Sequence, residues 1–560
     1  MNSYCGARFS KGKYLVFIKN VLKVHKFWLS FLIKLIESND SIGMVGSKII
    51  NQKGMLVEAG GIVWSNGECY NFGSGNNSSN PEYNYVKEVD YISGNSIMIK
   101  KTIWNKIGGF DPRFNPIYYE DTDFAFETRR LGYKVMFQPK SIVECSDDIF
   151  YQKSLTYGIK EINKQKFIKK WENDLAHQIE KGNTFLARDR GYNKSRILVI
   201  DRFVPNFDKD AGGRCSFIYL NIFCEIGLQV TFLGDNLKIM EPYTSILQQK
   251  GIEVLYGNDY KIDKLKRWLE LNLKYFQYIY LQRPEISIKY IDYIKNYFHG
   301  KIFYFAHDLH YNRLYREYII THDKKKFLLS KIIERIENKI FSTVDVIHVV
   351  GNYEYKILKE KYPNKTITNI PLYAYENQHK TINKNFSKRN GLIFVGAFGH
   401  PPNDDGILWF SKEIYPKIIE NFPDMILYIV STRIPQKIRQ LESKNIKIIG
   451  HLSDENLNRL YQKCRIAIAP LRFGAGVKGK IIEAAYNEIP MVTTSIGGEG
   501  IDYSKGAFIM EDNPDKFAQI IIKLYGNYTK LREMSDSGKI LINSYYTRKK
   551  AKEIIAKDLG

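Results

Sequence analysis

Residues 474–485 read Gly-Ala-Gly-Val-Lys-Gly-Lys-Ile-Ile-Glu-Ala-Ala, which joins a glycine-rich turn to a run of helix formers. Such a junction presents free backbone N–H groups at the positive end of a helix, where a diphosphate binds well. Lys478 and Lys480 add positive charge, and Glu483 follows Lys480 by one helical turn on the same face. Because a carboxylate does not bind phosphate, we expect Glu483 to accept hydrogen bonds from sugar or ribose hydroxyls. The pattern predicts a nucleotide-sugar site; a glycine-capped surface helix with two solvated lysines is the alternative.

Apolar runs alternate with amphipathic segments on the amino-terminal side of this turn. The predicted strands are 391–396, 425–430, 446–449 and 466–469, the predicted helices are 407–419, 436–441 and 454–463, and 400–406 is a predicted loop. A second alternating unit has predicted strands at 196–201, 229–233, 278–281, 301–306 and 344–350. Alternation of this kind predicts an α/β fold with parallel sheets, whose ligands bind beyond the carboxyl ends of the strands. We expect two Rossmann-like domains, 194–385 and 386–560, that face a cleft.

Four motifs in this region carry a family resemblance. They are Asp201-Arg-Phe-Val-Pro205 with Asp210-Ala-Gly-Gly213, His307-Asp-Leu-His310, Phe394-Val-Gly396 with Pro402-Asn-Asp-Asp-Gly406, and the 474–483 turn and helix. Together they resemble the GT-B glycosyltransferases, in particular the GT4-like group that acts in bacterial surface-polysaccharide assembly. The resemblance covers nearly all of residues 194–560.

The resemblance implies transfer of a sugar from a nucleotide diphosphate sugar to a glycan or lipid-linked acceptor, with retention of configuration and without a metal or another cofactor. It implies that Lys480 faces the diphosphate, that Glu483 faces hydroxyls of the ribose or sugar, and that His307 lies by the donor sugar. The further donor contacts that it implies are Gly212, Gly213, Gly474, Gly476, Lys478 and Glu499. This chain departs from the family in having no cation directly after Gly396, so we expect Arg472, Lys478 or the loop amides to take that role.

Residues 1–150 carry a different resemblance, to the acceptor-side half of a GT2-type GT-A glycosyltransferase. The motifs are Val89-Asp-Tyr-Ile-Ser-Gly94, Ile107-Gly-Gly-Phe-Asp111 and Tyr118-Tyr-Glu-Asp-Thr-Asp123. The resemblance implies an acceptor site at Asp90, Glu120 and Asp121, with Asp121 as the base. The alternative is that these acids only complement the dipole at a helix N-terminus.

Three losses predict that this N-terminal domain is a non-catalytic remnant. The chain enters past the nucleotide-binding half, as a natural start or as the product of a truncated reading frame. Lys19-Asn-Val-Leu22 replaces the run that would hold a divalent cation, and valine offers no oxygen ligand. Cys145 stands where the family has a histidine. We expect residues 151–193 to be a helical linker, with 187–195 as a polar loop.

The composition of the chain limits the kinds of molecule that we expect it to bind. The chain has 83 Lys and Arg against 60 Asp and Glu, a net charge of +23, but the lysines are spread along it without a nucleic-acid-binding module, so no nucleic-acid partner is expected. A basic surface suits anionic membrane lipids, and peripheral contact with the inner face of the membrane is a hypothesis. The six scattered cysteines contain no Cys-x-x-Cys pair, which favours a reducing cytoplasm and no zinc site.

Two other functions stay open at this stage. In the first, both glycosyltransferase-like regions are degenerate and the chain is a glycan-binding or scaffolding protein of the same pathway. In the second, the two Rossmann-like domains form a nucleotide-sugar epimerase, because a fold does not fix the reaction. The residues do not name the sugar, the nucleotide base or the acceptor.

Overall fold

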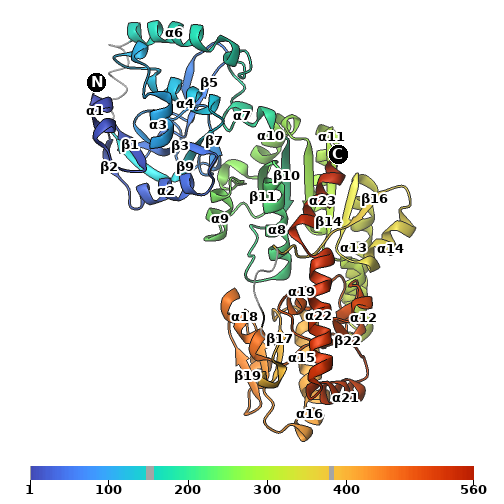
Figure 1. Cartoon of the computed structure of the whole chain (residues 1–560). Coiled ribbons are helices and arrows are strands. Elements are labelled where there is room, and N and C mark those ends of the chain that lie inside the picture. The colour runs from blue at the N-terminus through green and yellow to red at the C-terminus, as the bar shows by residue number, and fades with distance from the viewer. Residues whose placement is uncertain (1, 20, 147–156, 377–381, 383) are drawn as a thin grey trace. The chain divides into compact units, whose positions relative to one another are not determined.

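The computed structural model describes residues 2–19, 21–146, 157–376, 382 and 384–560 (Figure 1). Contacts divide the chain into two compact units. Unit 1 comprises Met1–Leu198 and Gly227–Gln277, and unit 2 comprises Val199–Ile226 and Tyr278–Gly560.

Unit 1 is built on a mixed sheet in the order β1-β8-β3-β9-β2, with β4 beside β3 and β7 beside β9. The long strands β3 and β9 are parallel, whereas β1 pairs with β8, β8 with β3 and β2 with β9 in the antiparallel sense. The strands are β1 (Tyr14–Ile18), β2 (Val21–Val24), β3 (Ile42–Asn51), β4 (Leu56–Glu58), β7 (Lys87–Glu88), β8 (Ser96–Lys100) and β9 (Lys134–Cys145), and β5 (Gly61–Val63) and β6 (Cys69–Asn71) form a separate hairpin. The helices are α1 (Asn2–Phe9), α2 (Trp28–Glu37), α3 (Lys101–Ile107) and α4 (Glu120–Arg130).

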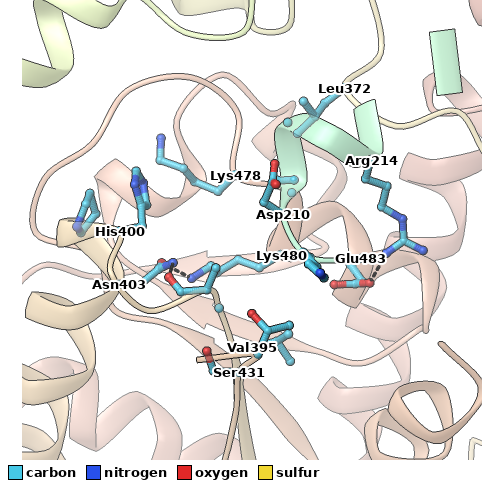
Figure 2. A pocket seen from close by; sticks show the side chains of 18 of the residues that line it. Asp210, Arg214, Leu372, Val395, His400, Asn403, Ser431, Lys478, Lys480 and Glu483 are labelled. Carbon is cyan, nitrogen blue, oxygen red and sulfur yellow. Dashed lines mark hydrogen bonds and ion pairs between the residues drawn. The ribbon is translucent and has the colours of Figure 1, made fainter. Parts of the chain in front are cut away.

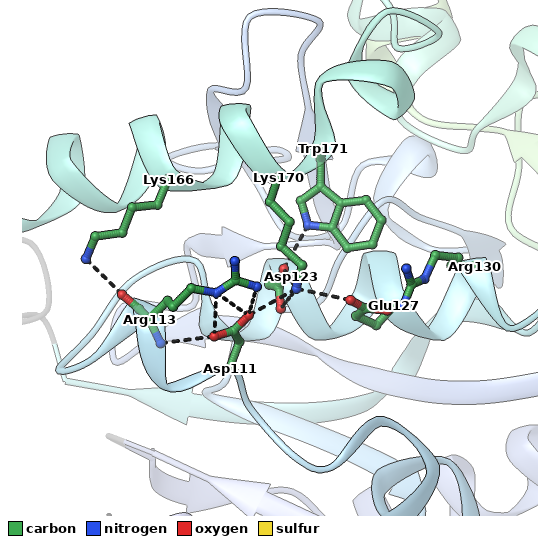
Figure 3. A network of polar contacts seen from close by, with 8 residues as sticks. All are labelled: Asp111, Arg113, Asp123, Glu127, Arg130, Lys166, Lys170 and Trp171. Carbon is green, nitrogen blue, oxygen red and sulfur yellow. Dashed lines mark hydrogen bonds and ion pairs between the residues drawn. The ribbon is translucent and has the colours of Figure 1, made fainter.

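Helix α6 (Tyr157–Leu175) confirms the helical character expected after residue 151 for its described residues, and one face of it is fixed to α4 by charge. The Lys170 ammonium lies 2.7 Å from Asp123, 3.0 Å from Glu127 and 3.2 Å from Asp111 (Figure 3). The buried Trp171 indole donates to Asp123 Oδ1 at 2.7 Å. One cation shared by three carboxylates, with an indole at its side, anchors α6 on the sheet domain rather than leaving it a free connector.

Residues 188–195 form a loop of turn and 3-10 conformation, as expected, but Ala187, Arg188, Asp189 and Gly191 are buried and the charged side chains pair within unit 1. Asp189 and Arg196, each 1% exposed, lie 2.5 Å apart, and Arg188 lies 2.7 Å from Glu253. Arg190 forms an ion pair with Asp90. The polar composition of this segment reflects a buried network of ion pairs. The sequence alone does not show which residues are the partners, so such a segment looks like a solvated loop.

The middle of the chain forms a seven-stranded sheet in the order β12-β11-β10-β13-β14-β15-β16. Its strands are β10 (Arg196–Asp201), β11 (Gln229–Gly234), β12 (Glu253–Leu255), β13 (Tyr278–Gln282), β14 (Lys301–Ala306), β15 (Val346–Val349) and β16 (Thr366–Asn369). The pairs β13–β14, β14–β15 and β15–β16 are parallel, as expected for a Rossmann-like sheet. Its helices are α7 (Thr184–Ala187), α8 (Ala211–Glu225), α9 (Tyr243–Gln249), α10 (Ile262–Asn272), α11 (Pro284–Tyr297), α12 (His310–Thr321), α13 (Lys324–Thr343) and α14 (Asn352–Lys361).

A second parallel sheet follows within unit 2, in the order β19-β18-β17-β20-β21-β22. The strands are β17 (Leu392–Val395), β18 (Leu427–Val430), β19 (Ile446–Ile449), β20 (Ile466–Ala469), β21 (Met491–Thr493) and β22 (Phe508–Met510). The helices are α15 (Pro401–Trp409), α16 (Tyr415–Asn421), α17 (Gln436–Arg439), α18 (Asp454–Lys463), α19 (Gly479–Tyr486), α20 (Ser495–Gly498), α21 (Pro514–Tyr525), α22 (Tyr528–Tyr545) and α23 (Arg548–Leu559). The order of strands changes direction at β17, which places a ligand crevice at its carboxyl end.

The expected loop at 400–406 was wrong. Helix α15 begins at Pro401, and a π-helical segment, Phe410–Ile414, follows it before α16. Proline fits the first turn of a helix because the N–H it lacks would have no partner there. Helix α23 then returns to the first sheet of unit 2, where Asp558 lies 3.0 Å from His348.

In the described part of the chain, no helix combines the length and the apolar character that a bilayer crossing requires.

We predict that Asp189→Ala lowers the free energy of unfolding of unit 1 by about 3–5 kcal/mol, because it leaves the buried Arg196 guanidinium without its countercharge. Hydrogen exchange measured by mass spectrometry on unit 1 peptides tests this, with the exposed Asp174→Ala as the matched control. Equal protection in the two variants would contradict the assignment.

Candidate active site

A cavity of about 450 Å³ lies within unit 2 where the strand ends of its two sheets converge (Figure 2). One wall comes from the start of α8 and from the residues that follow β13 and β14. The other comes from the residues that follow β17 and β20 and from the start of α19. The carboxyl ends of parallel strands are the expected place for a ligand, and both walls meet that rule.

Lys480 occupies the centre of the second wall. Its ammonium donates to Asn403 Oδ1 at 2.6 Å (Figure 2) and lies 4.3 Å from the centre of the Phe394 ring. It forms an ion pair with none of the described residues, and its one hydrogen-bond partner here is a neutral amide. Burial, and next the positive charge of Lys478, lower the pKa of Lys480 to about 7. Glu483 offsets this lowering only in part, so among the described residues the cavity holds an ammonium without an ion-pair partner.

Glu483 lies one turn along α19 from Lys480 and is tied to the first wall. Its Oε1 accepts a hydrogen bond from Arg214 of α8 at 2.9 Å (Figure 2), and Tyr461 approaches its Oε2 at 3.5 Å. Burial raises the pKa of Glu483, whereas Arg214 opposes the rise. The Arg214–Glu483 pair joins the two walls and leaves Oε2 with acceptor capacity for a hydroxyl.

The arginines around the cavity each have a carboxylate. Arg283 lies 3.4 Å from Asp201, and Arg313 lies 3.3 Å from Asp308. Their charge is therefore balanced within the protein, unlike that of Lys480. Arg283 and Arg313 also line a smaller adjoining pocket of about 330 Å³ with Asp201, Arg202 and His310.

Lys478, Gly476 and Glu354 organise the turn before α19. The Lys478 ammonium donates to the Gly476 carbonyl and lies 4.0 Å from Glu499. The Gly476 N–H, expected to be free for a phosphate, donates to Glu354 Oε1 at 2.9 Å. Burial raises the pKa of Glu354 to about 7. Glycine is required at 476, because its φ is +71° and a Cβ there would lie 2.9 Å from the His307 carbonyl oxygen.

His307 is placed at the end of β14, on the cavity wall, as expected. Its Nε2 donates to Gln282 Oε1 at 2.8 Å, which leaves Nδ1 as a buried acceptor without a partner among the described residues. Burial, and next Arg283, hold the pKa of His307 well below its usual range. A neutral imidazole can accept a hydrogen bond from a ligand but carries no charge to a phosphate.

The other predicted donor contacts divide into two groups. Gly212 and Gly474 line the cavity, Gly476 lies outside its lining, and Gly213 lines the adjoining pocket and donates its N–H to Asp210. Glu499 lies outside the cavity lining and forms a bidentate pair with Arg316, at 2.7 and 2.8 Å. Arg472 likewise pairs with Asp405 and is absent from the lining, so Lys478 is the cation that the cavity receives from this turn.

The three predicted acceptor-site acids of unit 1 do not form one open cluster of free carboxylates. Asp90 pairs with Arg190 and accepts from the Val63 N–H at 3.0 Å. Asp121 accepts from the backbone of Gly94 at 2.7 Å. Burial, and next Asp121, raise the pKa of Glu120 to about 7, and its Oε2 has no partner among the described residues.

The sequence did not single out Arg283 or Asn403 as site residues. Arg283 directly follows a strand that was predicted, so the strand-end rule was the signal that could have found it. Asn403 sat in the segment mistaken for a loop. Among the described residues, no group of three or more His, Cys, Asp or Glu side chains is placed to bind a metal ion.

We predict that Lys478→Met raises the pKa of Lys480, because it removes the neighbouring positive charge. Competitive acetylation followed by mass spectrometry over a range of pH measures the midpoint. It should fall near 7 in the wild-type chain and higher in Lys478→Met. A wild-type Lys480 midpoint of about 10.4, the value for a lysine side chain in water, would contradict the burial of an unpaired ammonium.

Part of the chain is similar to known proteins. Residues 389–527 match the family model described as "Glycosyl transferases group 1". A Klebsiella pneumoniae protein described as "Uncharacterized 44.6 kDa protein in cps region" is 31% identical over 175 residues, which are 30% of this chain and 45% of that protein. The chain therefore matches less than half the length of that relative.

Two solved structures resemble the chain at low identity. Sucrose-phosphate synthase from Thermosynechococcus elongatus has a TM-score of 0.51 and 11% identity, over 65% of this chain and 98% of that one. TarM has a TM-score of 0.51 and 10% identity, over 66% of this chain and 99% of that one. At this identity the likeness concerns the fold, and it confirms the expected α/β fold with two Rossmann-like domains. Residues 389–527 are thus similar to the group 1 glycosyl transferases, and they lie in a fold of two Rossmann-like domains.

Proposed function

We propose that this chain is a GT4-like glycosyltransferase that uses the unit 2 cavity to transfer a sugar from a nucleotide diphosphate sugar to an acceptor hydroxyl. The observation that carries the proposal is Lys480, whose ammonium lies in the cavity without an ion-pair partner among the described residues. A diphosphate supplies that partner. The group 1 match over 389–527 supports the reaction class, because the match includes Lys480 and Glu483.

In the proposed reaction, the bond between the anomeric carbon and the diphosphate oxygen breaks and the acceptor oxygen bonds to the same carbon. The acceptor proton passes to the departing phosphate oxygen, and the new bond retains the configuration. Lys480, Lys478 and the N-terminus of α19 stabilise the negative charge that grows on the diphosphate. No protein nucleophile and no divalent cation are required by this scheme.

Glu483 and His307 take positioning roles in this proposal. Glu483 Oε2 accepts from a hydroxyl of the ribose or the sugar while Arg214 holds the carboxylate in place. The free Nδ1 of neutral His307 accepts from a hydroxyl of the donor sugar. Each group can make its hydrogen bond without leaving its present protein partner.

The proposal extends to the pathway and to the acceptor. The relative from a cps region supports a role in surface-polysaccharide synthesis. We propose a glycan or lipid-linked acceptor for unit 2. For the sheet domain of unit 1, we propose a remnant of a GT2-type domain that does not transfer sugar, because Asp90 is already committed to Arg190.

Lys480→Met should lower kcat/KM about 10²- to 10³-fold, because it removes one donor to the developing charge. The donor is first identified by thermal shift with a panel of nucleotide sugars, with Mg²⁺ and with a chelator. Transfer is then measured with that donor, and Lys444→Met serves as the exposed control. No stabilisation by any donor, in a chain that melts cooperatively, would overturn the proposal and favour a scaffolding protein.

Donor affinity should weaken as the pH rises above about 7. Lys480 is protonated below its free pKa of about 7, and a bound diphosphate raises that pKa, so binding takes up a proton above pH 7. The loss approaches about tenfold per pH unit until the pKa of the complex is reached. Isothermal titration in buffers of different ionisation enthalpy measures the proton uptake, which should vanish in Lys480→Met.

A further inference from the structure

The hairpin of α12 and α13 presents apolar side chains to water. The exposed residues are Tyr315, Ile319 and Ile320 of α12 and Leu328, Leu329 and Ile332 of α13, which we call the hairpin patch. Leu328 is 62% exposed and Ile332 is 54% exposed, and the two are one helical turn apart on the side of α13 opposite its buried residues. Tyr315 and Ile319 have the same spacing on α12.

The two halves of the hairpin patch belong to one surface. Helices α12 and α13 pack against each other, and the Tyr315 and Tyr318 rings lie 6.4 and 5.3 Å from the Phe327 ring. The Ser330 hydroxyl of α13 also donates to the Tyr311 carbonyl at 2.8 Å. The exposed apolar side chains are therefore held on a folded and well-packed element.

The hairpin carries an excess of positive charge. Residues 310–343 contain eight Lys and Arg against four Asp and Glu, of which Glu317 and Glu337 are buried. Five of the eight cations pair with a carboxylate, namely Arg313, Arg316, Lys326, Lys331 and Lys339. Lys324 and Lys325 are exposed at the turn end of α13. Apolar residues within a basic surface favour a bilayer with anionic headgroups over a neutral protein partner.

Helix α12 also links this surface to the cavity. Arg313, near its first turn, lines the cavity and the adjoining pocket, and Tyr315 follows two residues later and Ile319 six residues later. At a rise of about 1.5 Å per residue, the patch begins about 3 Å along the helix from Arg313, and Ile319 lies about 9 Å along it. An acceptor anchored in the bilayer would have to present its head group within about this distance.

We propose that the hairpin patch is a docking surface for an anionic membrane. Its apolar side chains enter the interface and Lys324 and Lys325 meet the headgroups. Membrane docking does not depend on the proposed function. Only the purpose of docking, which is access to a lipid-linked acceptor, rests on the proposed function.

Vesicle flotation with the full chain tests the proposal. Vesicles of phosphatidylcholine are compared with vesicles that contain about one third phosphatidylglycerol. We expect binding to the anionic vesicles that weakens from about 0.1 M to about 0.5 M salt. The double variant Leu328→Ser with Ile332→Ser should lower vesicle binding at least about tenfold. The double variant Lys324→Gln with Lys325→Gln should lower it about fivefold for each substituted lysine.

Matched controls are Ile540→Ser, an equally exposed apolar residue on α22, and Lys444→Gln. Both should leave binding unchanged, and thermal melting checks the fold of every variant. If the serine pair does not fold, the Lys324 and Lys325 variants still test the surface. No preference for anionic vesicles, or equal loss in the controls, would overturn the proposal.

Two further measurements distinguish other outcomes. Light scattering after gel filtration would reveal a dimer that the serine pair dissociates, in which case the patch binds a second copy and the proposal is wrong. Donor binding by thermal shift should be unchanged in the patch variants. Loss of donor binding in the wild-type chain with intact flotation would refute the proposed function and leave membrane docking in place.

Discussion

The cavity of unit 2 depends on how buried positive charge is balanced. Removing an ammonium or a guanidinium from water is costly unless a carboxylate lies beside it. Arg214, Arg283 and Arg313 each have such a partner, and the Lys480 ammonium rests on the neutral amide of Asn403. The low pKa of Lys480 is the physical result, since loss of the proton relieves the cost when no ligand is bound. An anionic ligand relieves the same cost by restoring the missing charge.

The parallel sheets explain why these groups meet although they lie far apart in the chain. Arg214 follows β10 and Glu483 follows β20, 269 residues later, yet each begins a helix at the carboxyl end of its sheet. The walls are then fixed by polar contacts. Arg214 reaches Glu483, and Glu354 holds the Gly476 amide. Part of the predicted phosphate cradle is therefore already used by the protein, which leaves side-chain charge as the main attraction for a diphosphate.

Much of the fold could be predicted because the strands are continuous apolar runs between polar residues. The strands 196–201, 301–306, 446–449 and 466–469 were predicted with the bounds that the structure has. The helix at Pro401 was missed because two prolines in sequence resemble a loop, although the first helical turn accepts both. The buried ionic segment near Asp189 was missed for a related reason. A charged stretch looks solvated until its partners, such as Arg196 and Glu253, are known in space.

The sequence predicted several of the residues that belong to the candidate site, but it did not predict which of them pair with one another. Sequence spacing placed Lys480 and Glu483 on one helix face, but it could not show that Glu483 would pair with Arg214 while Lys480 would be left without a carboxylate. Unit 1 shows the opposite imbalance. There Glu120 and Asp121 are half-buried next to each other, and the pKa of each is raised. A pair of carboxyl groups offers a diphosphate no positive charge and repels it once the groups ionise, whereas an unpaired lysine attracts it, so the electrostatics of the two units support the proposed donor site in unit 2.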